Sequence, residues 1–218
     1  MNSKKYACID IGTNSIRLLI AEVENGRLIS RTKKLKMTRL GHGVAETKML
    51  DPHRMIDSLN AIDAFHHEAI LSGCAATFIY ATSAVRDAYN GIDFRQMVYN
   101  KTELEFDIIS GTQEAKLGFY GSRSGCNATG NHMVMDIGGG STEYIYGSER
   151  GMIDAISIDI GGVRLTGNYI TTDPVSEAEL EQVREHIRTQ LRTVKILFEN
   201  YEVGSIVGIG GTVTAFAS

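Results

Sequence analysis

Three short turns rich in Gly, Ser, Thr and Asn follow strand-like runs of this chain, and an aspartate stands just before two of them. They are Gly12, Thr13, Asn14 and Ser15 after Asp10; Gly138, Gly139, Gly140 and Ser141 after Asp136; and Gly210, Gly211 and Thr212. Glycine lets the backbone approach a bulky anion, and successive N–H groups and hydroxyls then bind phosphate oxygens. Carboxylates beside them suit Mg²⁺ or Mn²⁺. Together the turns predict a site for a metal-bound chain of phosphates.

Any one of these turns, taken alone, is explained just as well by an ordinary hairpin. None is a Walker loop, because the sequence has no Gly-Lys-Ser or Gly-Lys-Thr step. The prediction of anion binding therefore depends on the recurrence of the turns and on the acid that precedes two of them.

The first turn and the second belong to a longer repeat. Asp10-Ile11-Gly12 recurs as Asp136-Ile137-Gly138, and in each copy a second strand and then a hairpin signal follow, through Asn25-Gly26 and Glu149-Arg150-Gly151. Acid, turn, strand and hairpin recur in the same order. We therefore expect an internal duplication, with one such hairpin in each half of the chain.

The elements between these hairpins predict an α/β fold. A three-stranded meander is expected over residues 6–36, and a helix with Asp51 as its N-cap is expected to end at Gly73. Strands are expected over 75–81 and 106–109, and helices over 93–100 and 112–121. In the second half, Ser176 and Glu179 form a capping box for a long helix, and a strand over 205–208 follows. This alternation indicates mixed sheets covered by helices.

We expect two domains, 1–122 and 123–218, with the second C-terminally incomplete, because the first half has further elements after the corresponding strand. Net charge is −4, so nucleic acid is not an expected partner. The apolar runs are too short to cross a membrane, and no signal peptide opens the chain, so the expected location is cytoplasmic. Cys8, Cys74 and Cys126 lack CxxC spacing, and the histidines lack metal-ligand spacing.

Five blocks, in order, resemble the exopolyphosphatase / guanosine pentaphosphate phosphohydrolase family of the actin/Hsp70/sugar-kinase superfamily. They are Asp10–Arg17, Ala81–Ala88, Ser110–Ala115, Asp136–Glu143 and Gly208–Thr212. The resemblance covers essentially the whole chain. It implies duplicated RNase-H-like domains of the actin-like ATPase type, with a cleft between them.

The resemblance also implies roles for single residues. Glu114 matches the catalytic base, although an acid near a helix start is also favoured by the helix dipole alone. Asp136 and Glu143 match acids near the metal, and Asp10 is expected close by. Arg86 and Arg17 match groups near the scissile phosphate: a clamp is favoured for Arg86, whereas clamp and salt bridge are equal alternatives for Arg17. The two turns of the repeat match phosphate loops, with Thr13 in place of a more usual Ser.

The function that this implies is hydrolysis of the terminal phosphate of inorganic polyphosphate or guanosine pentaphosphate. Two alternatives stay open. One is a kinase-like ATPase of the same superfamily, which would transfer phosphate to an acceptor. The other is a sensor that binds polyphosphate or an alarmone without turnover. The oligomeric state is also open, with a homodimer as one alternative.

Overall fold

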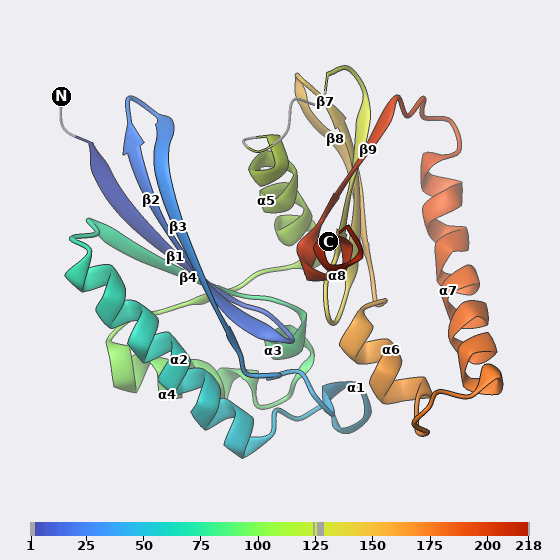
Figure 1. The fold of residues 1–218 in the computed structure, drawn as a ribbon, viewed down its shortest axis with the longest axis horizontal. Helices are drawn as coiled ribbons and strands as arrows, with labels where there is room; N and C mark the ends of the chain where they lie inside the picture. The colour runs from blue at the N-terminus through green and yellow to red at the C-terminus, as the bar shows by residue number, and fades with distance from the viewer. Residues whose placement is uncertain (1–2, 124, 126–128, 218) are drawn as a thin grey trace. The chain divides into compact units, whose positions relative to one another are not determined.

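The computed structural model describes residues 3–123, 125 and 129–217, and its chain divides into two compact units, Met1–Ile109 and Ser110–Ser218 (Figure 1). Each unit has its own sheet and its own helices. Cys126 lies outside the described residues, whereas Cys8 and Cys74 are free thiols. Burial raises the pKa of Cys8 to about 11, so this thiol stays protonated at neutral pH.

The sheet of the first unit has the strand order β3-β2-β1-β4-β5. Its strands are β1 (Lys4–Ile11), β2 (Ser15–Glu24), β3 (Arg27–Met37), β4 (Ala76–Ala81) and β5 (Asp107–Ile108). The first three form the expected antiparallel meander, with Asn25 and Gly26 both at positive φ in the hairpin turn between β2 and β3. Strand β4 then pairs parallel to β1.

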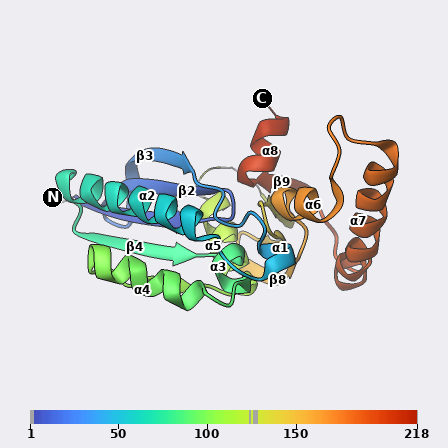
Figure 2. The same ribbon diagram turned by 90° about the horizontal axis from the view of Figure 1, so that it is seen from below.

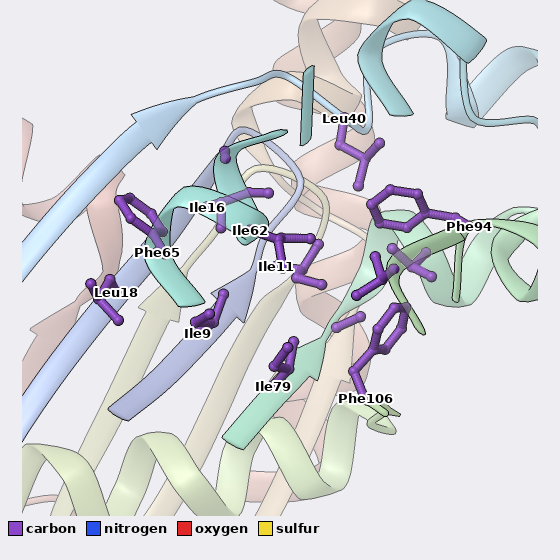
Figure 3. Packing of buried hydrophobic residues seen from close by; sticks show 14 of the residues in the cluster. Ile9, Ile11, Ile16, Leu18, Leu40, Ile62, Phe65, Ile79, Phe94 and Phe106 are labelled. Atoms are coloured by element: carbon purple, nitrogen blue, oxygen red, sulfur yellow. The ribbon is translucent and has the colours of Figure 1, made fainter. Parts of the chain in front are cut away.

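Helices cover one face of this sheet and enclose the core of the first unit. They are α1 (Val44–Thr47), α2 (Pro52–Leu71), α3 (Ser83–Asp87) and α4 (Gly91–Thr102). Helix α2 begins as expected, with the Asp51 side chain accepting from the Arg54 amide. Figure 3 shows how its apolar residues meet those of the strands: Ile62 and Phe65 lie over Ile9, Ile11, Ile16 and Leu18. Phe94 and Phe106 close the core beside them, with ring centroids 6.1 Å apart.

The second unit repeats this plan with the strand order β8-β7-β6-β9. Its strands are β6 (His132–Ile137), β7 (Thr142–Ser148), β8 (Gly151–Ile158) and β9 (Ser205–Ile209). Its helices are α5 (Gly111–Arg123), α6 (Gly162–Tyr169), α7 (Glu177–Phe198) and α8 (Gly210–Phe216). Strands β6, β7 and β8 form an antiparallel meander, and β9 pairs parallel to β6 as β4 does to β1.

Strand alternation divides the second sheet into two apolar faces. Tyr144 and Tyr146 of β7 pack on the side of α7, whereas Ile145 packs on the side of α5 with Phe119. Figure 1 shows α5 and α7 on opposite sides of this sheet, and Figure 2 shows α6 beside α7. By the same alternation, Asp136 and Glu143 belong to the face of the sheet that α5 covers.

The α/β fold with a duplicated meander, expected from the Asp-Ile-Gly repeat, is confirmed, and helices α2 and α7 occupy the same place in the two units. The expected domain boundary at residues 122 and 123 stays a prediction. In the structure α5 packs against β6, β7 and β8, so the compact units divide before it, at Ile109 and Ser110. The sequence does not predict helices α1, α3 and α6. In the described part of the chain, no helix is long and apolar enough to span a membrane.

A buried carboxylate, Glu179, organises the loop between α6 and α7. It accepts hydrogen bonds from the backbone and hydroxyl groups of Thr171, Thr172 and Ser176, and Ser176 in turn caps α7 as expected. The Thr172 hydroxyl, followed by the Ser176 amide, lowers the pKa of Glu179 far below its usual value of 4.5. The loop conformation therefore depends on the ionised form.

Replacing this carboxylate should loosen the loop. Because the folded-state pKa is depressed, the stabilisation is present above the usual pKa and is lost as pH falls towards the folded-state value. Glu179→Gln should lower the thermal unfolding midpoint by several degrees at about pH 7, and the difference from the parent should shrink below about pH 4. Glu181→Gln, which removes only exposed pairs with Arg184 and Arg188, is the matched control and should change little. Equal midpoints for parent and Glu179→Gln at neutral pH would contradict this assignment.

Candidate functional site

The two turns of the repeat are closed by the same hydrogen bond. The amide of Gly12 donates to the carbonyl of Ser15 at 3.1 Å, and the amide of Gly138 donates to the carbonyl of Ser141 at 3.0 Å. A Cβ at Gly12 would lie 3.0 Å from the Ser15 oxygen, and one at Gly138 would lie 3.2 Å from the Ser141 oxygen. Glycine is therefore favoured at the start of both turns, because a carbonyl oxygen of the same turn lies close to the position that a Cβ would take.

In the first turn, the following segment of chain binds the carbonyl groups. Asn14 O accepts from the amides of Thr38 at 3.2 Å and Arg39 at 2.9 Å, and Thr13 O accepts from the amide of Gly41 at 2.8 Å. These bonds orient the carbonyl oxygens of the turn towards residues 38–41.

The second turn is held in a similar way, but with one side chain. Gly139 O accepts from the amides of Val163 at 2.9 Å and Arg164 at 3.0 Å. Gly140 O accepts from Arg164 Nε at 2.6 Å, and the Arg164 guanidinium also lies 3.6 Å from the Asp159 carboxylate. The Arg164 side chain thus connects the second turn to Asp159.

While the carbonyls are occupied, backbone N–H groups of both turns are available for another acceptor. Within the described residues, the amides of Thr13, Asn14, Gly139 and Gly140 donate no hydrogen bond to the protein. Successive amides of this kind form an anion-binding concavity. The backbone of each turn is therefore suited to phosphate oxygens, as the sequence predicts.

The hydroxyl of Thr13 has a partner that sequence reasoning missed. Its Oγ1 lies 2.8 Å from the Oγ of Ser83 in α3, and both side chains are buried. The bond fixes α3 to the first turn. Ser83 lies in the Ala81–Ala88 block, but a contact across 70 residues leaves no local signal in the sequence.

The acid before the first turn faces a cation on the next strand. Asp10 is opposite Arg17 in the β1–β2 register, and their side chains lie 3.6 Å apart. Burial raises the pKa of the half-buried Asp10 carboxyl, and the Arg17 charge opposes that rise. Arg17 therefore has the salt bridge that was one of its two sequence alternatives.

The acid before the second turn faces another acid. Asp136 is opposite Glu143 in the β6–β7 register, which is the same pair of positions that Asp10 and Arg17 occupy in the first unit. Glu143 is buried, and Ser157 Oγ donates to its Oε1 at 2.7 Å from β8. Both carboxylates belong to the face of the sheet that α5 covers, because they share the parity of Val134 and Ile145.

Two glycines leave space for the Asp136 carboxylate. A Cβ on Gly210 would lie 2.5 Å from Asp136 Oδ1 and 2.7 Å from the carbonyl of Ile137, and one on Gly118 of α5 would lie 3.7 Å from Oδ2. Gly210 also has a φ of +89°, a conformation that disfavours any residue with a Cβ. The first residue of the third turn is thus required for the placement of Asp136.

Glu114 lies in the first turn of α5, the helix that covers the Asp136 and Glu143 face. The start of α5 is a capping box: Gln113 Oε1 accepts from the Ser110 amide at 2.8 Å, and Ser110 Oγ accepts from the Gln113 amide at 3.2 Å. Gly111, on the same side of the helix as Glu114, packs so closely on Ser157 that a Cβ would lie 2.5 Å from the Ser157 Cβ. The structure therefore places Glu114 in one compact unit with both acids, whereas the sequence assigned it to the other domain.

Arg86 is held in α3 of the first unit. Its Nη1 donates to the carbonyl of Ile109 at 2.8 Å, and its side chain is largely buried. This bond fixes the chain just before Ser110, where α5 is capped. The expected role of Arg86 as a clamp on phosphate stays a prediction, as do the phosphate-binding roles of Ser15, Gly211 and Thr212.

The paired acids fit a hard divalent cation. Mg²⁺ keeps several waters and uses one or two carboxylates together with substrate phosphates, which matches Asp136 and Glu143. No group of three or more His, Cys, Asp or Glu side chains suited to a metal is found in the described residues. Asp10 belongs to the other unit, so its part in a metal site stays a prediction.

Comparison with known proteins identifies the family. Residues 19–218 match the Ppx/GppA phosphatase family. The chain belongs to this family. Exopolyphosphatase 2 of Mycobacterium tuberculosis is 32% identical over 98% of this chain and 70% of its own length. A bifunctional 3-dehydroquinate synthase/phosphatase of Fusobacterium nucleatum is 33% identical over the whole of this chain, which spans only 34% of that protein.

Solved structures agree with this assignment. A crystal structure of the Aquifex aeolicus member of the Ppx/GppA family is 31% identical, with a TM-score of 0.79 over 99% of this chain and 69% of that one. The likeness confirms the expected fold class of the family. The enzyme class expected from the sequence, a phosphatase that hydrolyses phosphoanhydrides, is the class of this family.

A methyl group at Gly210 should disturb the second unit and displace Asp136. The left-handed conformation alone costs a residue with a Cβ about 1–2 kcal/mol, and the contact with Asp136 Oδ1 adds to that cost. Gly210→Ala should therefore lower the free energy of unfolding, measured by urea denaturation, by at least this amount.

The control is Gly162→Ala at the start of α6, where an added Cβ would meet nothing within 4 Å. It should leave the unfolding free energy nearly unchanged. If Gly210→Ala were as stable as Gly162→Ala, the close seating of Asp136 against the third turn would be wrong.

Proposed function

We propose that this protein hydrolyses the terminal phosphoanhydride bond of inorganic polyphosphate, with the help of Mg²⁺. The observation that carries the proposal is the shared face of the second sheet: Asp136 and Glu143 lie opposite each other on it, and the helix that covers it carries Glu114. The exopolyphosphatases among the relatives support polyphosphate as the substrate.

Glu114 is proposed as the general base. In the reaction a water molecule attacks the terminal phosphorus, the bond to the bridging oxygen breaks, and orthophosphate leaves with a shortened chain. The protein needs to orient that water and accept its proton, because most of the catalysis is positioning and stabilisation of charge. The capping box of Ser110 and Gln113 fixes the first turn of α5 and so limits the positions that Glu114 can take.

The amides of the two turns are proposed to hold the phosphate oxygens. In the first unit these are the amides of Thr13 and Asn14, and in the second unit they are the amides of Gly139 and Gly140. Asp136 and Glu143 would hold Mg²⁺, which neutralises negative charge on the phosphates when bound. Arg86 is proposed to hold the transferring phosphate through its guanidinium.

Guanosine pentaphosphate is the second substrate that family membership suggests. We propose polyphosphate first because exopolyphosphatases are among the relatives of this chain. Release of orthophosphate is measured with each of the two substrates, and in a third reaction with ATP and an acceptor alcohol. Hydrolysis releases orthophosphate, whereas a kinase-like transfer would phosphorylate the alcohol.

Removing the base should slow turnover strongly and leave binding intact. Glu114→Gln should lower kcat for polyphosphate by roughly a hundredfold to ten-thousandfold, the usual contribution of general-base catalysis. Affinity for polyphosphate, measured by isothermal titration calorimetry, should stay the same or improve slightly, because one negative charge leaves an anion site. Glu185→Gln on the exposed surface of α7 is the control and should behave as the parent.

The result also separates the enzyme from a sensor. A parent protein that binds polyphosphate but releases no orthophosphate, with and without Mg²⁺, would support the sensor and overturn the proposal. A Glu114→Gln protein that hydrolyses polyphosphate at the parent rate would leave Glu114 as an acid that only favours the helix start.

The two metal candidates should respond differently from the base. Asp136→Asn and Glu143→Gln each remove one carboxylate charge from the pair, so the Mg²⁺ concentration needed for half-maximal activity should rise by about tenfold or more. Binding of polyphosphate in the presence of Mg²⁺ should weaken in parallel, in contrast to Glu114→Gln. Circular dichroism checks that each variant folds. An unchanged Mg²⁺ dependence in the folded Glu143→Gln protein would remove Glu143 from the metal site.

A further inference from the structure

Arg39 has an unusual backbone conformation beside the first turn. Four residues other than glycine have a positive φ in the described chain: Asn25, Arg39, Lys48 and Glu103. Asn25 lies in a hairpin turn, and Lys48 and Glu103 follow the last residues of α1 and α4, so each of these three occupies a common place for that conformation. Arg39 is in neither context.

The first turn holds Arg39 in this conformation. The Arg39 amide donates to Asn14 O at 2.9 Å, and two residues later the Gly41 amide donates to Thr13 O at 2.8 Å. A left-handed backbone disfavours a residue with a long side chain and persists where the surroundings impose it, often at functional sites. Glycine or asparagine would meet the backbone requirement more easily than arginine. The presence of arginine therefore points to a use for its side chain.

Comparison of the two units shows that the Arg39 guanidinium is not needed to hold the first turn. There, Arg164 uses its side chain, through Nε, to bind the carbonyl of Gly140, which occupies the place of Asn14. In the first unit, backbone amides bind the Asn14 carbonyl instead. The Arg39 side chain is exposed, and within residues 3–123, 125 and 129–217 no acidic side chain forms an ion pair with it.

The positive charge of Arg17, which follows the same turn, is already offset by an acid. Arg17 lies 3.6 Å from Asp10, so its charge is offset within the unit. The Arg39 amide binds the carbonyl of Asn14, a residue whose own amide is available to an anion. The guanidinium of Arg39 can therefore supply positive charge to a phosphate bound at this turn.

We propose that Arg39 is a substrate-binding residue, and that its guanidinium binds phosphate oxygens of the polyphosphate chain held at the first turn. The assignment rests on the proposed function and adds to it a determinant of affinity for the anionic chain. The competing interpretation is that the Arg39 side chain is only solvated and that the Arg39 backbone alone stabilises the turn. The two interpretations predict different affinities for polyphosphate when the Arg39 side chain is removed and the unfavourable backbone conformation is made easy to adopt.

Arg39→Gly makes this distinction, because glycine adopts the left-handed conformation without cost. The thermal unfolding midpoint should stay the same or rise. The KM and the dissociation constant for polyphosphate, at fixed ionic strength, should rise on the order of tenfold to a hundredfold, as expected for the loss of charge-assisted hydrogen bonds. The kcat at saturating polyphosphate should stay near that of the parent. Arg39→Lys, which keeps the charge and loses the bidentate geometry, should recover part of the affinity.

Lys48→Gly is the matched control. It removes one cation from the same unit and replaces another residue of positive φ, but Lys48 follows α1 and contacts no residue of the turn through the hydrogen bonds described. It should leave KM and the dissociation constant unchanged. Equal losses of affinity in Lys48→Gly and Arg39→Gly would show a general charge effect and overturn the assignment.

Failure of this inference is separate from failure of the proposed function. If the parent hydrolyses polyphosphate and Arg39→Gly keeps the parent KM, Arg39 is a solvated arginine and the proposed hydrolysis stands. If the parent binds polyphosphate without turnover, the dissociation constant of Arg39→Gly still decides the role of Arg39. If the parent neither binds nor hydrolyses polyphosphate, both proposals are wrong.

Discussion

The pairing of β6 with β7 places two carboxylates, Asp136 and Glu143, side by side on the sheet face that α5 covers. Like charges directly opposite each other on adjacent strands are unfavourable, and burial of Glu143 increases that cost. Much of the surrounding structure reduces it: Ser157 donates to Glu143, and Gly118 and Gly210 leave room beside Asp136. A divalent cation would offset the repulsion further. The arrangement therefore supports the proposal of a cation site at these two carboxylates.

The duplicated scaffold makes the difference between the two units easy to locate. Both units have the same turn, the same closing hydrogen bond and the same strand register, but one holds Arg17 where the other holds Glu143. With Arg17, the first unit neutralises its own aspartate. With Glu143, the second unit adds to the negative charge. This single difference of residue type at one register position is the reason for proposing metal binding in the second unit, whereas the backbone of both turns is proposed to bind phosphate.

Local signals allowed much of the fold to be predicted from the sequence. The Asn25-Gly26 hairpin and the caps at Asp51 and Ser176 each depend on neighbours within a few residues, and each is confirmed. Long-range partners could not be predicted. The register of β7 with β8 shifts at Tyr146 and Gly147, so counting back from the hairpin does not place Ser157 opposite Glu143. An amphipathic pattern likewise shows that α5 packs on a sheet without showing which sheet.

The hydrogen bonds that hold the two turns bear on the proposed binding of phosphate by a neutral backbone. In an isolated turn the carbonyl oxygens lie near the amides and cancel much of their field. Here residues 38–41 and 162–164 donate to those oxygens, and the amides of Thr13, Asn14, Gly139 and Gly140 have no acceptor among the described residues. Such a concavity binds any small oxyanion of suitable size, because amides do not distinguish one from another. Discrimination in favour of a long phosphate chain, and the choice between holding it and cleaving it, must therefore come from side chains around the turns rather than from the turns themselves.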